Sequence, residues 1–437
     1  MTRRSFLVIV HPYPPTPSSG ANRWGAIVKY LRRDGHDVRV ITSAAFGELS
    51  DPTQEQGVTR TADLMASPRL RSLVGLAPLA WPDATGSRAP TVSTPGGADP
   101  GLPGLLTRTL VPDAFLVSWA PMALRAARRA LRERPADVVV TSSPNESTHL
   151  VGAALRRGSR HAWIADLRDG WTFERFLPEF PTKAQQRLNS MLERRALVGA
   201  DAVMAATRPI AGDLRGRLGI DVTHVPNAWD PDLEPDLGPP AAAAPGGRVE
   251  LVHTGKMSGG WGRDPSALFS ALRRLLSEEP ELAGRVRLTL AGRLDAEESR
   301  LIEEAGLDRV LSHVGQLDRA EAVRLQRRAG VLVLVTSGHS GEATGKLFEY
   351  LAAGRPILAL AAGNEAARIV AETGTGVAVD PADGDALLAA VRAAVHGELP
   401  YSPRGLDAYR HPAPARQVSA LADRALAWRH GGRGGER

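Results

Sequence analysis

The sequence predicts an α/β protein made of two Rossmann-like, doubly wound parallel-sheet domains, and three observations lead to this fold class. The chain has 437 residues, enough for two or three domains that each bury a core. Short and nearly continuous Val/Ile/Leu runs recur along it, which is typical of strands buried on both faces of a parallel sheet. Segments with helical spacing separate these runs, which is the alternation of a doubly wound fold.

The apolar runs fall into two series, one for each domain. The first series lies at residues 6–10, 38–42, 137–142, 162–166, 202–206 and 223–226. The second lies at residues 249–254, 286–291, 311–315, 331–335, 356–361 and 376–379. The segments between them that have helical spacing, such as 21–34 and 264–277, end near Gly or Pro, as helices commonly do.

Changes in composition mark the domain boundaries. We expect an N-terminal domain at 1–235, a Pro-, Ala- and Gly-rich linker at 236–247 and a second domain at 248–405. Residues 83–104 have few large apolar side chains, which indicates a mobile insertion in the first domain. A helical pattern within 406–430 is expected to pack back on the first domain, and 431–437 is expected to be a disordered tail.

Composition excludes several classes of function. The absence of cysteine excludes disulfides and thiolate chemistry, and a net charge of +6 is small for this length. Only four cations are lysines: Lys29, Lys183, Lys256 and Lys346.

Without a signal peptide or an apolar run of membrane-spanning length, we expect a cytoplasmic protein. The arginine-rich helix 125–134 could give peripheral contact with the inner membrane face, but a solvated helix face is the favoured explanation because no stripe of large apolar residues accompanies it. The basic residues are dispersed along the chain, which argues against a nucleic-acid partner.

Two segments of the first domain are candidate sites. The Gly-x-Gly-x-x-Gly motif of dinucleotide-binding domains is absent after the first strand. Ser19, Gly20 and Asn22 stand there instead, at a helix N-terminus that suits an anion or a sugar hydroxyl, although the first or last could simply cap the helix. Asp166, Arg168 and Asp169 follow a predicted strand and could supply a base and an orienting ion pair, or only a structural ion pair.

The second domain carries the strongest candidate site. A buried strand ends in the loop 336–345, whose amides can surround a phosphate, and a helix begins near Thr344. Lys346 would offer a point charge to phosphate, and Glu349 would accept both hydroxyls of a ribose; a simple surface pair is the alternative. Lys256 and Arg263 flank a glycine-rich turn that suits a diphosphate, unless it is an ordinary flexible turn.

These motifs, in this order, resemble the nucleotide-sugar glycosyltransferases of the GT-B type, in particular the large retaining family four and its branch for bacterial polysaccharide and amino-sugar transfer. The similar segments are HPYPPTPSSGANRW, RRDGHDVRVIT, PDAFLVSWAPMA, DLRDGW, ERRALVGADAVMAAT, VPNAWD and GKLFEYLAAGRPILAL. The resemblance implies two domains facing across a cleft, with the acceptor on the first and the nucleotide-sugar on the second.

The resemblance also implies a set of donor contacts. Glu349 would bind the ribose, Lys256 and Arg263 the diphosphate, and Lys346 with the amides of 341–345 the phosphate and sugar. Gly341, Glu342, Thr344 and Gly345 belong to this donor loop, and Asp166 lies near the acceptor-side polar residue of relatives. Many relatives carry a glutamate where this chain has Gly341, with Glu342 one position later, which affects the expected sugar recognition.

The resemblance therefore implies a retaining glycosyltransferase that moves a hexosyl or N-acetylhexosaminyl group, with the leaving diphosphate taking the acceptor proton. The donor is expected to be UDP-linked, and the acceptor a lipid-linked saccharide or a small natural product. No cofactor and no metal is expected; Asp230 and Asp232 form an Asp-x-Asp motif that belongs to a different fold. The alternatives are a nucleotide-sugar epimerase or hydrolase on the same fold, and a silent sugar-nucleotide-binding protein.

Overall fold

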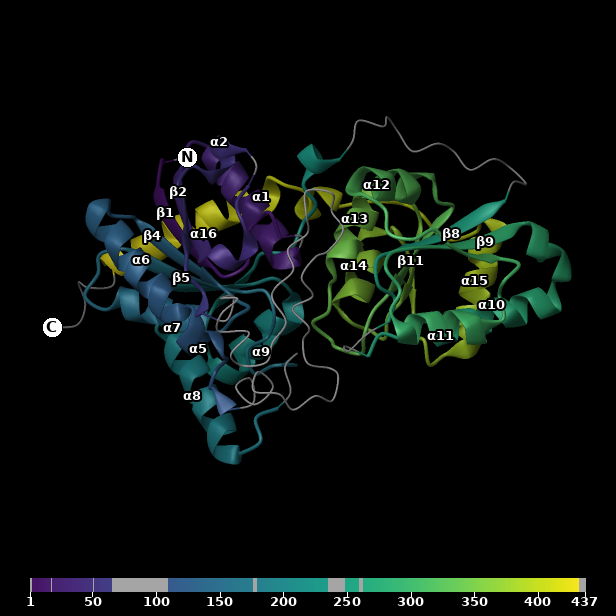
Figure 1. Ribbon diagram of the computed structural model, residues 1–437, viewed down its shortest axis with the longest axis horizontal. Coiled ribbons are helices and arrows are strands. Elements are labelled where there is room, and N and C mark those ends of the chain that lie inside the picture. The colour runs from purple at the N-terminus through teal and green to yellow at the C-terminus, as the bar shows by residue number, and fades with distance from the viewer. Residues whose placement is uncertain are drawn as a thin grey trace. The chain divides into compact units, whose positions relative to one another are not determined.

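The computed structural model describes residues 2–16, 18–49, 51–64, 109–175, 179–234, 248–258 and 262–431. The chain divides into two compact units (Figure 1): unit 1 is Met1–Pro226 with His411–Arg437, and unit 2 is Asn227–Arg410. Each unit contains one parallel sheet, so the predicted fold class of two parallel-sheet α/β domains is confirmed. The expected insertion at 83–104, the linker at 236–247 and the tail after residue 431 lie outside the described residues.

Unit 1 is built on a seven-stranded sheet with the order β3-β2-β1-β4-β5-β6-β7. Its strands are β1 (Ser5–Val10), β2 (Asp37–Ser43), β3 (Val58–Thr61), β4 (Val138–Ser142), β5 (Ala162–Leu167), β6 (Ala202–Ala205) and β7 (Val222–His224). The edge strand β3 was not among the predicted strands. Along β1, Leu7 and Ile9 pack into the core on one face, whereas Phe6 and Val8 pack on the other, which explains the uninterrupted apolar run.

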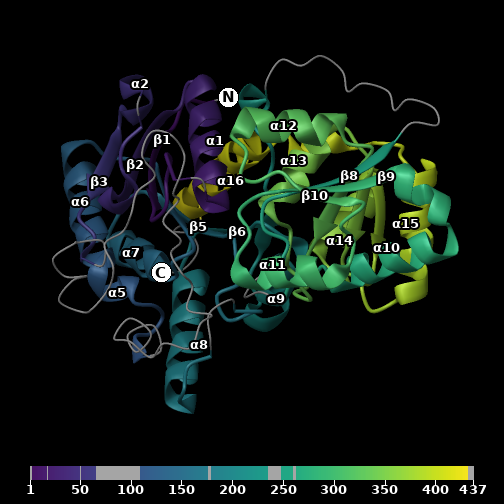
Figure 2. The same cartoon turned by 45° about the vertical axis from the view of Figure 1, so that its right-hand side comes forward.

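Helices cover both faces of this sheet (Figures 1 and 2). They are α1 (Ser19–Arg33), α2 (Pro52–Glu55), α5 (Phe115–Ser118), α6 (Ala120–Glu133), α7 (Ser147–Arg156), α8 (Lys183–Val198), α9 (Arg208–Leu218) and α16 (Ala413–Gly431). The last of these packs against α1 and β5, so the C-terminal segment returns to unit 1 and closes one face of its core with Val418 and Leu421.

Unit 2 is built on a six-stranded sheet with the order β10-β9-β8-β11-β12-β13. Its strands are β8 (Val249–Thr254), β9 (Val286–Ala291), β10 (Leu311–His313), β11 (Val331–Val335), β12 (Ile357–Leu360) and β13 (Gly376–Val379). Its helices are α10 (Ser266–Glu278), α11 (Ala296–Ala305), α12 (Arg319–Arg328), α13 (Gly345–Ala353), α14 (Glu365–Thr373) and α15 (Gly384–His396). The core on one face includes α10 and α15, and the other includes α12, α13 and α14. None of the described helices has the length and apolar character needed to cross a membrane.

Candidate functional site

The predicted donor loops of unit 2 come together at the carboxyl ends of β8 and β11. The turn after β8 contains Gly255, and the aliphatic part of Lys346 from α13 lies directly over it. Arg263, which follows the same turn, donates from Nε and Nη2 to Glu342 Oε1 at 2.9 and 2.6 Å. Parallel strands end at the same edge of a sheet, so residues distant in sequence meet there.

Glu349 has partners on only one of its carboxylate oxygens within the described residues. Lys346 Nζ donates to Oε2 at 2.8 Å, and Gln326 Nε2 donates to the same oxygen at 3.3 Å. Gln326 is almost fully buried and also donates to Thr254 Oγ1 at 2.9 Å, which joins Glu349 to the end of β8. No described residue donates to Oε1, so this oxygen can accept a hydrogen bond from a ligand.

Glu342 has an inward position that its sequence context did not suggest. It is buried and accepts from the backbone and side chain of Ser337 as well as from Arg263. The carboxylate therefore holds the loop after β11 to the segment after β8. Thr344, the N-cap residue of α13, makes no capping bond, and its hydroxyl is buried without a partner in the described part of the chain. Gly341 and Gly345 lie on either side of it in this loop.

Lys256 lies in the turn after β8 and pairs with Asp295, with 2.5 Å between Nζ and Oδ2. Both side chains are about half exposed, so a charged ligand can compete for the ammonium group. The turn itself is held from below by Glu298, a buried residue of α11 whose Oε1 accepts from the backbone amides of Met257 and Ser258 at 2.8 and 3.0 Å.

Burial sets the protonation of two groups behind these loops. Burial lowers the pKa of His253 to about 4, and the nearby Lys346 and Arg263 act in the same direction, so the imidazole is neutral at pH 7. Its Nδ1 donates to Val333 O at 2.9 Å. Burial likewise raises the pKa of Tyr350 to about 12, and its hydroxyl oxygen accepts from Thr254 N at 3.0 Å.

In unit 1, the two predicted segments meet at the start of α1. Arg168 Nη1 donates to Ser19 Oγ at 2.7 Å, and Arg168 Nη2 donates to Asp169 Oδ2 at 2.5 Å. Gly20 is buried and lies beneath this guanidinium: a Cβ added to it would be 3.0 Å from Arg168 Nη1. Asn22 is exposed on α1. The helix is capped by Ser18, whose Oγ accepts from Ala21 N at 3.1 Å, so neither Ser19 nor Asn22 serves as the cap.

Asp166 lies apart from this exposed group, although it is only two residues from Arg168. It is completely buried at the end of β5. Its Oδ1 accepts from Arg23 Nη2 at 3.0 Å, and its Oδ2 accepts from Trp24 Nε1 at 2.9 Å and Ser142 Oγ at 2.8 Å. Arg23 continues to the carbonyls of Val225 and Pro226. Asp166 therefore ties α1 and the chain beyond β7 to the centre of the sheet.

A buried carboxyl pair near the same sheet edge was not found from the sequence. Asp113 accepts from the backbone amides of Phe115 and Ser147 at 2.9 and 2.8 Å. Glu146 lies beside it, and burial followed by the charge of Asp113 raises the pKa of Glu146 to about 8. Burial raises the pKa of Asp113 as well, so the pair retains a proton near neutral pH.

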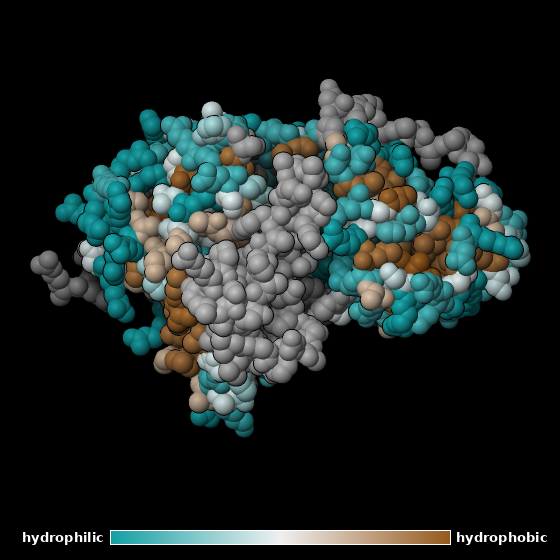
Figure 3. Space-filling view, viewed as in Figure 1, coloured by the Kyte–Doolittle hydropathy of each residue, from teal (hydrophilic) through white to brown (hydrophobic). Residues whose placement is uncertain are grey.

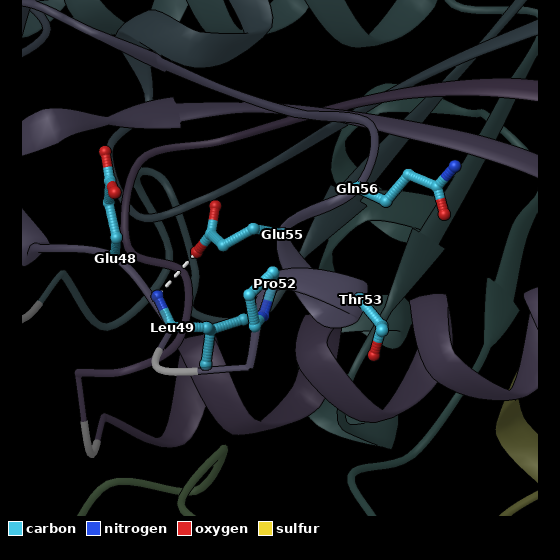
Figure 4. A pocket seen from close by; sticks show the side chains of 6 residues that line it. All are labelled: Glu48, Leu49, Pro52, Thr53, Glu55 and Gln56. Atoms are coloured by element: carbon cyan, nitrogen blue, oxygen red, sulfur yellow. Dashed lines mark hydrogen bonds between the residues drawn. The ribbon is translucent and has the colours of Figure 1, made fainter.

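Two other features of the described residues carry no predicted chemistry. No group of three or more His, Cys, Asp or Glu residues in that part of the chain is arranged to hold a metal ion, and Asp230 of the Asp-x-Asp motif caps the short turn Pro231–Leu233. Figure 4 shows a shallow hollow of unit 1, lined by Glu48, Leu49, Pro52, Thr53, Glu55 and Gln56. Its Glu55 carboxylate already accepts from Leu49 N at 2.6 Å and from Arg60.

Two family profiles match consecutive parts of the chain. The profile for the glycosyl transferase 4-like domain matches residues 20–228, and the profile for glycosyl transferases group 1 matches residues 248–396. The chain belongs to the group 1 GT-B glycosyltransferases. The first match begins at Gly20 and contains Asp169, and the second contains Lys256 and Glu349. Among curated protein sequences, nothing matches this glycosyltransferase.

Solved structures with the same fold span nearly the whole glycosyltransferase. Sucrose-phosphate synthase from Thermosynechococcus elongatus has a TM-score of 0.63 at 17% identity, with 97% of this chain and 100% of that chain covered. The lipopolysaccharide outer core galactosyltransferase WaaB has a TM-score of 0.59 at 13% identity, covering 95% and 98%. A glycosyltransferase from Rickettsia africae has a TM-score of 0.56 at 14% identity, covering 98% and 99%. At these identities the likeness concerns the fold.

Proposed function

We propose that this glycosyltransferase transfers a hexosyl or N-acetylhexosaminyl group from a UDP-sugar, with retention of anomeric configuration, to a lipid-linked saccharide or a small natural-product acceptor. The observation that carries the proposal is the one-sided pairing of Glu349. Its Oε2 is held by Lys346 and Gln326, and its Oε1 has no donor among the described residues. A carboxylate fixed in this way can accept hydrogen bonds from ribose hydroxyls.

In this proposal, the cations of the two donor loops bind the diphosphate. Lys346 sits in the first turn of α13, where the helix dipole also favours an anion. Lys256 would exchange its half-exposed partner Asp295 for phosphate oxygens. Arg263 is held by Glu342, so we assign it to shaping the loop as well as to the diphosphate. The unpartnered hydroxyl of Thr344 would turn to the sugar or the phosphate.

The acceptor is proposed to bind at the carboxyl edge of the unit 1 sheet, where Ser19, Arg168 and Asp169 present polar atoms. Asp166 would position this edge without contacting substrate, since it is completely buried. The leaving diphosphate would take the proton of the attacking hydroxyl, while the lysines stabilise the negative charge that develops on it. This proposal requires no protein nucleophile.

The Glu349→Gln variant tests the donor site. It should bind UDP roughly ten- to a hundredfold more weakly by calorimetry, because a hydrogen bond to a charged group contributes about 1.5–3 kcal/mol. Glu304→Gln is the matched control, since Glu304 forms an exposed ion pair with Arg300 in the same unit. Unchanged UDP affinity in Glu349→Gln would contradict the site.

A second experiment tests the reaction. Wild-type protein is incubated with UDP-sugars, with and without a panel of saccharide and lipid-linked acceptors, and the products are followed by NMR. The proposal predicts an acceptor-dependent product with the donor's anomeric configuration. A new epimer or free sugar without acceptor would instead indicate an epimerase or a hydrolase. Tight UDP binding without turnover would indicate a silent binding protein.

A further inference from the structure

The helix α8 of unit 1 has two different apolar faces. Its inner face buries Asn189, Glu193, Ala196 and Leu197 against the rest of the unit. On the opposite side, Leu188, Met191 and Val198 are 41%, 46% and 51% exposed. Their spacing of three and seven residues places them along one stripe of the helix. A helix that has already buried one face has no need of a second apolar stripe for folding.

Basic residues border this outer stripe. Lys183, Arg187, Arg194 and Arg195 are all exposed, and none of them forms an ion pair with another described residue. The single acidic residue of the helix, Glu193, is buried and bound by Arg217 at 2.6 Å, so it does not offset these charges on the surface. Figure 3 shows hydrophobic and hydrophilic residues side by side in the lower part of unit 1, where Figure 1 places α8.

We propose that the outer face of α8 docks on an anionic phospholipid surface. Leucine, methionine and valine would enter the interface between headgroups and acyl chains, and the flanking cations would pair with lipid phosphates. Charge complementarity selects this occupant. A second copy of the chain would bring the same cations against each other, and a nucleic acid would use the cations while leaving the apolar stripe in water.

The helix α6 provides a useful contrast, because the sequence singled out its arginines for membrane contact. Its buried residues are alanines, and Arg129 pairs with Glu133 at 2.7 Å. None of the exposed large apolar side chains of the described residues belongs to α6. Electrostatic attraction alone is weak and is screened by salt, so α8, which combines both contributions, is the better membrane-binding element.

Vesicle co-sedimentation of the full-length protein tests this proposal. We expect binding to vesicles of mixed phosphatidylglycerol and phosphatidylcholine and much weaker binding to pure phosphatidylcholine. Arg187→Gln with Arg194→Gln should weaken binding by about fivefold for each cation. Leu188→Gln with Met191→Gln should weaken it by about tenfold or more. The matched controls are Arg125→Gln with Arg128→Gln on α6, and Val314→Gln, an exposed apolar residue of unit 2; both should bind like wild type.

A gain-of-signal variant keeps the test independent of any loss of folding. The emission of Leu188→Trp, taken as the difference from wild type, should shift to the blue when phosphatidylglycerol vesicles are added. Vesicle binding without this shift, or unchanged binding by both α8 double variants, would overturn the proposal. The proposal would also fail if the charge variant alone lost vesicle binding, because a surface that uses only its cations is one suited to a nucleic acid. It would fail as well if light scattering showed that the apolar variant had abolished a dimer.

Discussion

Lys346 of α13 lies directly over Gly255 of the turn after β8: a Cβ added to Gly255 would be 3.0 Å from Lys346 Cε. Gly255 also has a φ of +98°, a backbone conformation that residues with a side chain rarely adopt. Two residues far apart in the sequence therefore lie next to each other at the edge of the unit 2 sheet. The glycine gives the lysine room to extend along the turn that carries Lys256.

Replacing this glycine should separate binding from stability. Gly255→Ala should displace the Lys346 side chain and weaken UDP binding by about tenfold, in addition to a backbone cost of about 1–3 kcal/mol. Gly397→Ala is the control, since Gly397 has a φ of +75° with nothing within 4 Å of the added Cβ. It should lose stability in urea unfolding while its UDP affinity by calorimetry stays the same. Equal UDP affinity in both variants would show that the position of Lys346 is unimportant.

Glu342 of the donor loop and Glu349 of α13 should behave in opposite ways. Glu342→Gln removes a buried charge from Arg263 and Ser337, and we expect a loss of about 1.5–3 kcal/mol in the free energy of unfolding. Glu349→Gln removes a partly exposed pair with Lys346, and its unfolding free energy should change by less than about 1 kcal/mol. Urea titrations of both variants make the comparison. A reversed order would mean that their structural roles are exchanged.

Asp166 and Asp169 allow the same separation in unit 1. Asp166→Asn leaves the fully buried Arg23 without its counter-charge, so the free energy of unfolding should fall by about 3–5 kcal/mol. Asp169→Asn changes a partly exposed pair with Arg168 and should lower transfer activity with little effect on stability. Thermal unfolding and initial rates of sugar transfer, measured on both variants, distinguish a structural role from a role in transfer. Normal stability in Asp166→Asn would argue against its role in holding α1 to the sheet.

The pair of Asp113 and Glu146 predicts a dependence of stability on pH. The pKa of Glu146 rises from 4.5 to about 8 on folding, so the folded state binds the extra proton. Its contribution to stability is therefore full below about pH 4.5 and is lost as the pH rises through about 8. Glu146→Gln should remove most of this slope between pH 6.5 and 8 in urea unfolding followed by tryptophan fluorescence. The buried histidines His149, His161 and His253, whose pKa values are lowered from 6.5 to about 4 on folding, gain protons only in the unfolded state near pH 6.5, so they add the same slope to wild type and variant. An equal slope in wild type and variant would contradict the assignment.

The apolar runs predicted most of the fold because central parallel strands are apolar on both faces. The edge strand β3 escaped prediction for the same reason: only Thr61 of its four residues is buried, so it has no continuous apolar run. The predicted strand at 223–226 is displaced from β7, which ends at His224. Beyond it, Val225 N still donates to Ala205 O, but Pro226 has no amide hydrogen to extend the pairing.

The convergence of the donor loops could be anticipated, since loops at the carboxyl ends of neighbouring parallel strands must meet. The supporting contacts could not. Gln326 and Glu298 lie on helices whose other polar residues face solvent, and nothing local marks them as buried. Arg23 and Asp166 are 143 positions apart in the chain, and only the folded sheet brings them together. Such pairings depend on tertiary packing, which a single sequence does not record.

The carboxylate of Glu298 has a consequence for how a diphosphate would be received. It already occupies the amides of Met257 and Ser258, which are groups that a free anion could otherwise use. The protein thus places its own carboxylate against these two amides, and this contact fixes the backbone of Met257 and Ser258 before any substrate arrives. A donor that binds at this turn would not lose binding free energy to ordering that backbone. Its selectivity would then come from contacts with side chains.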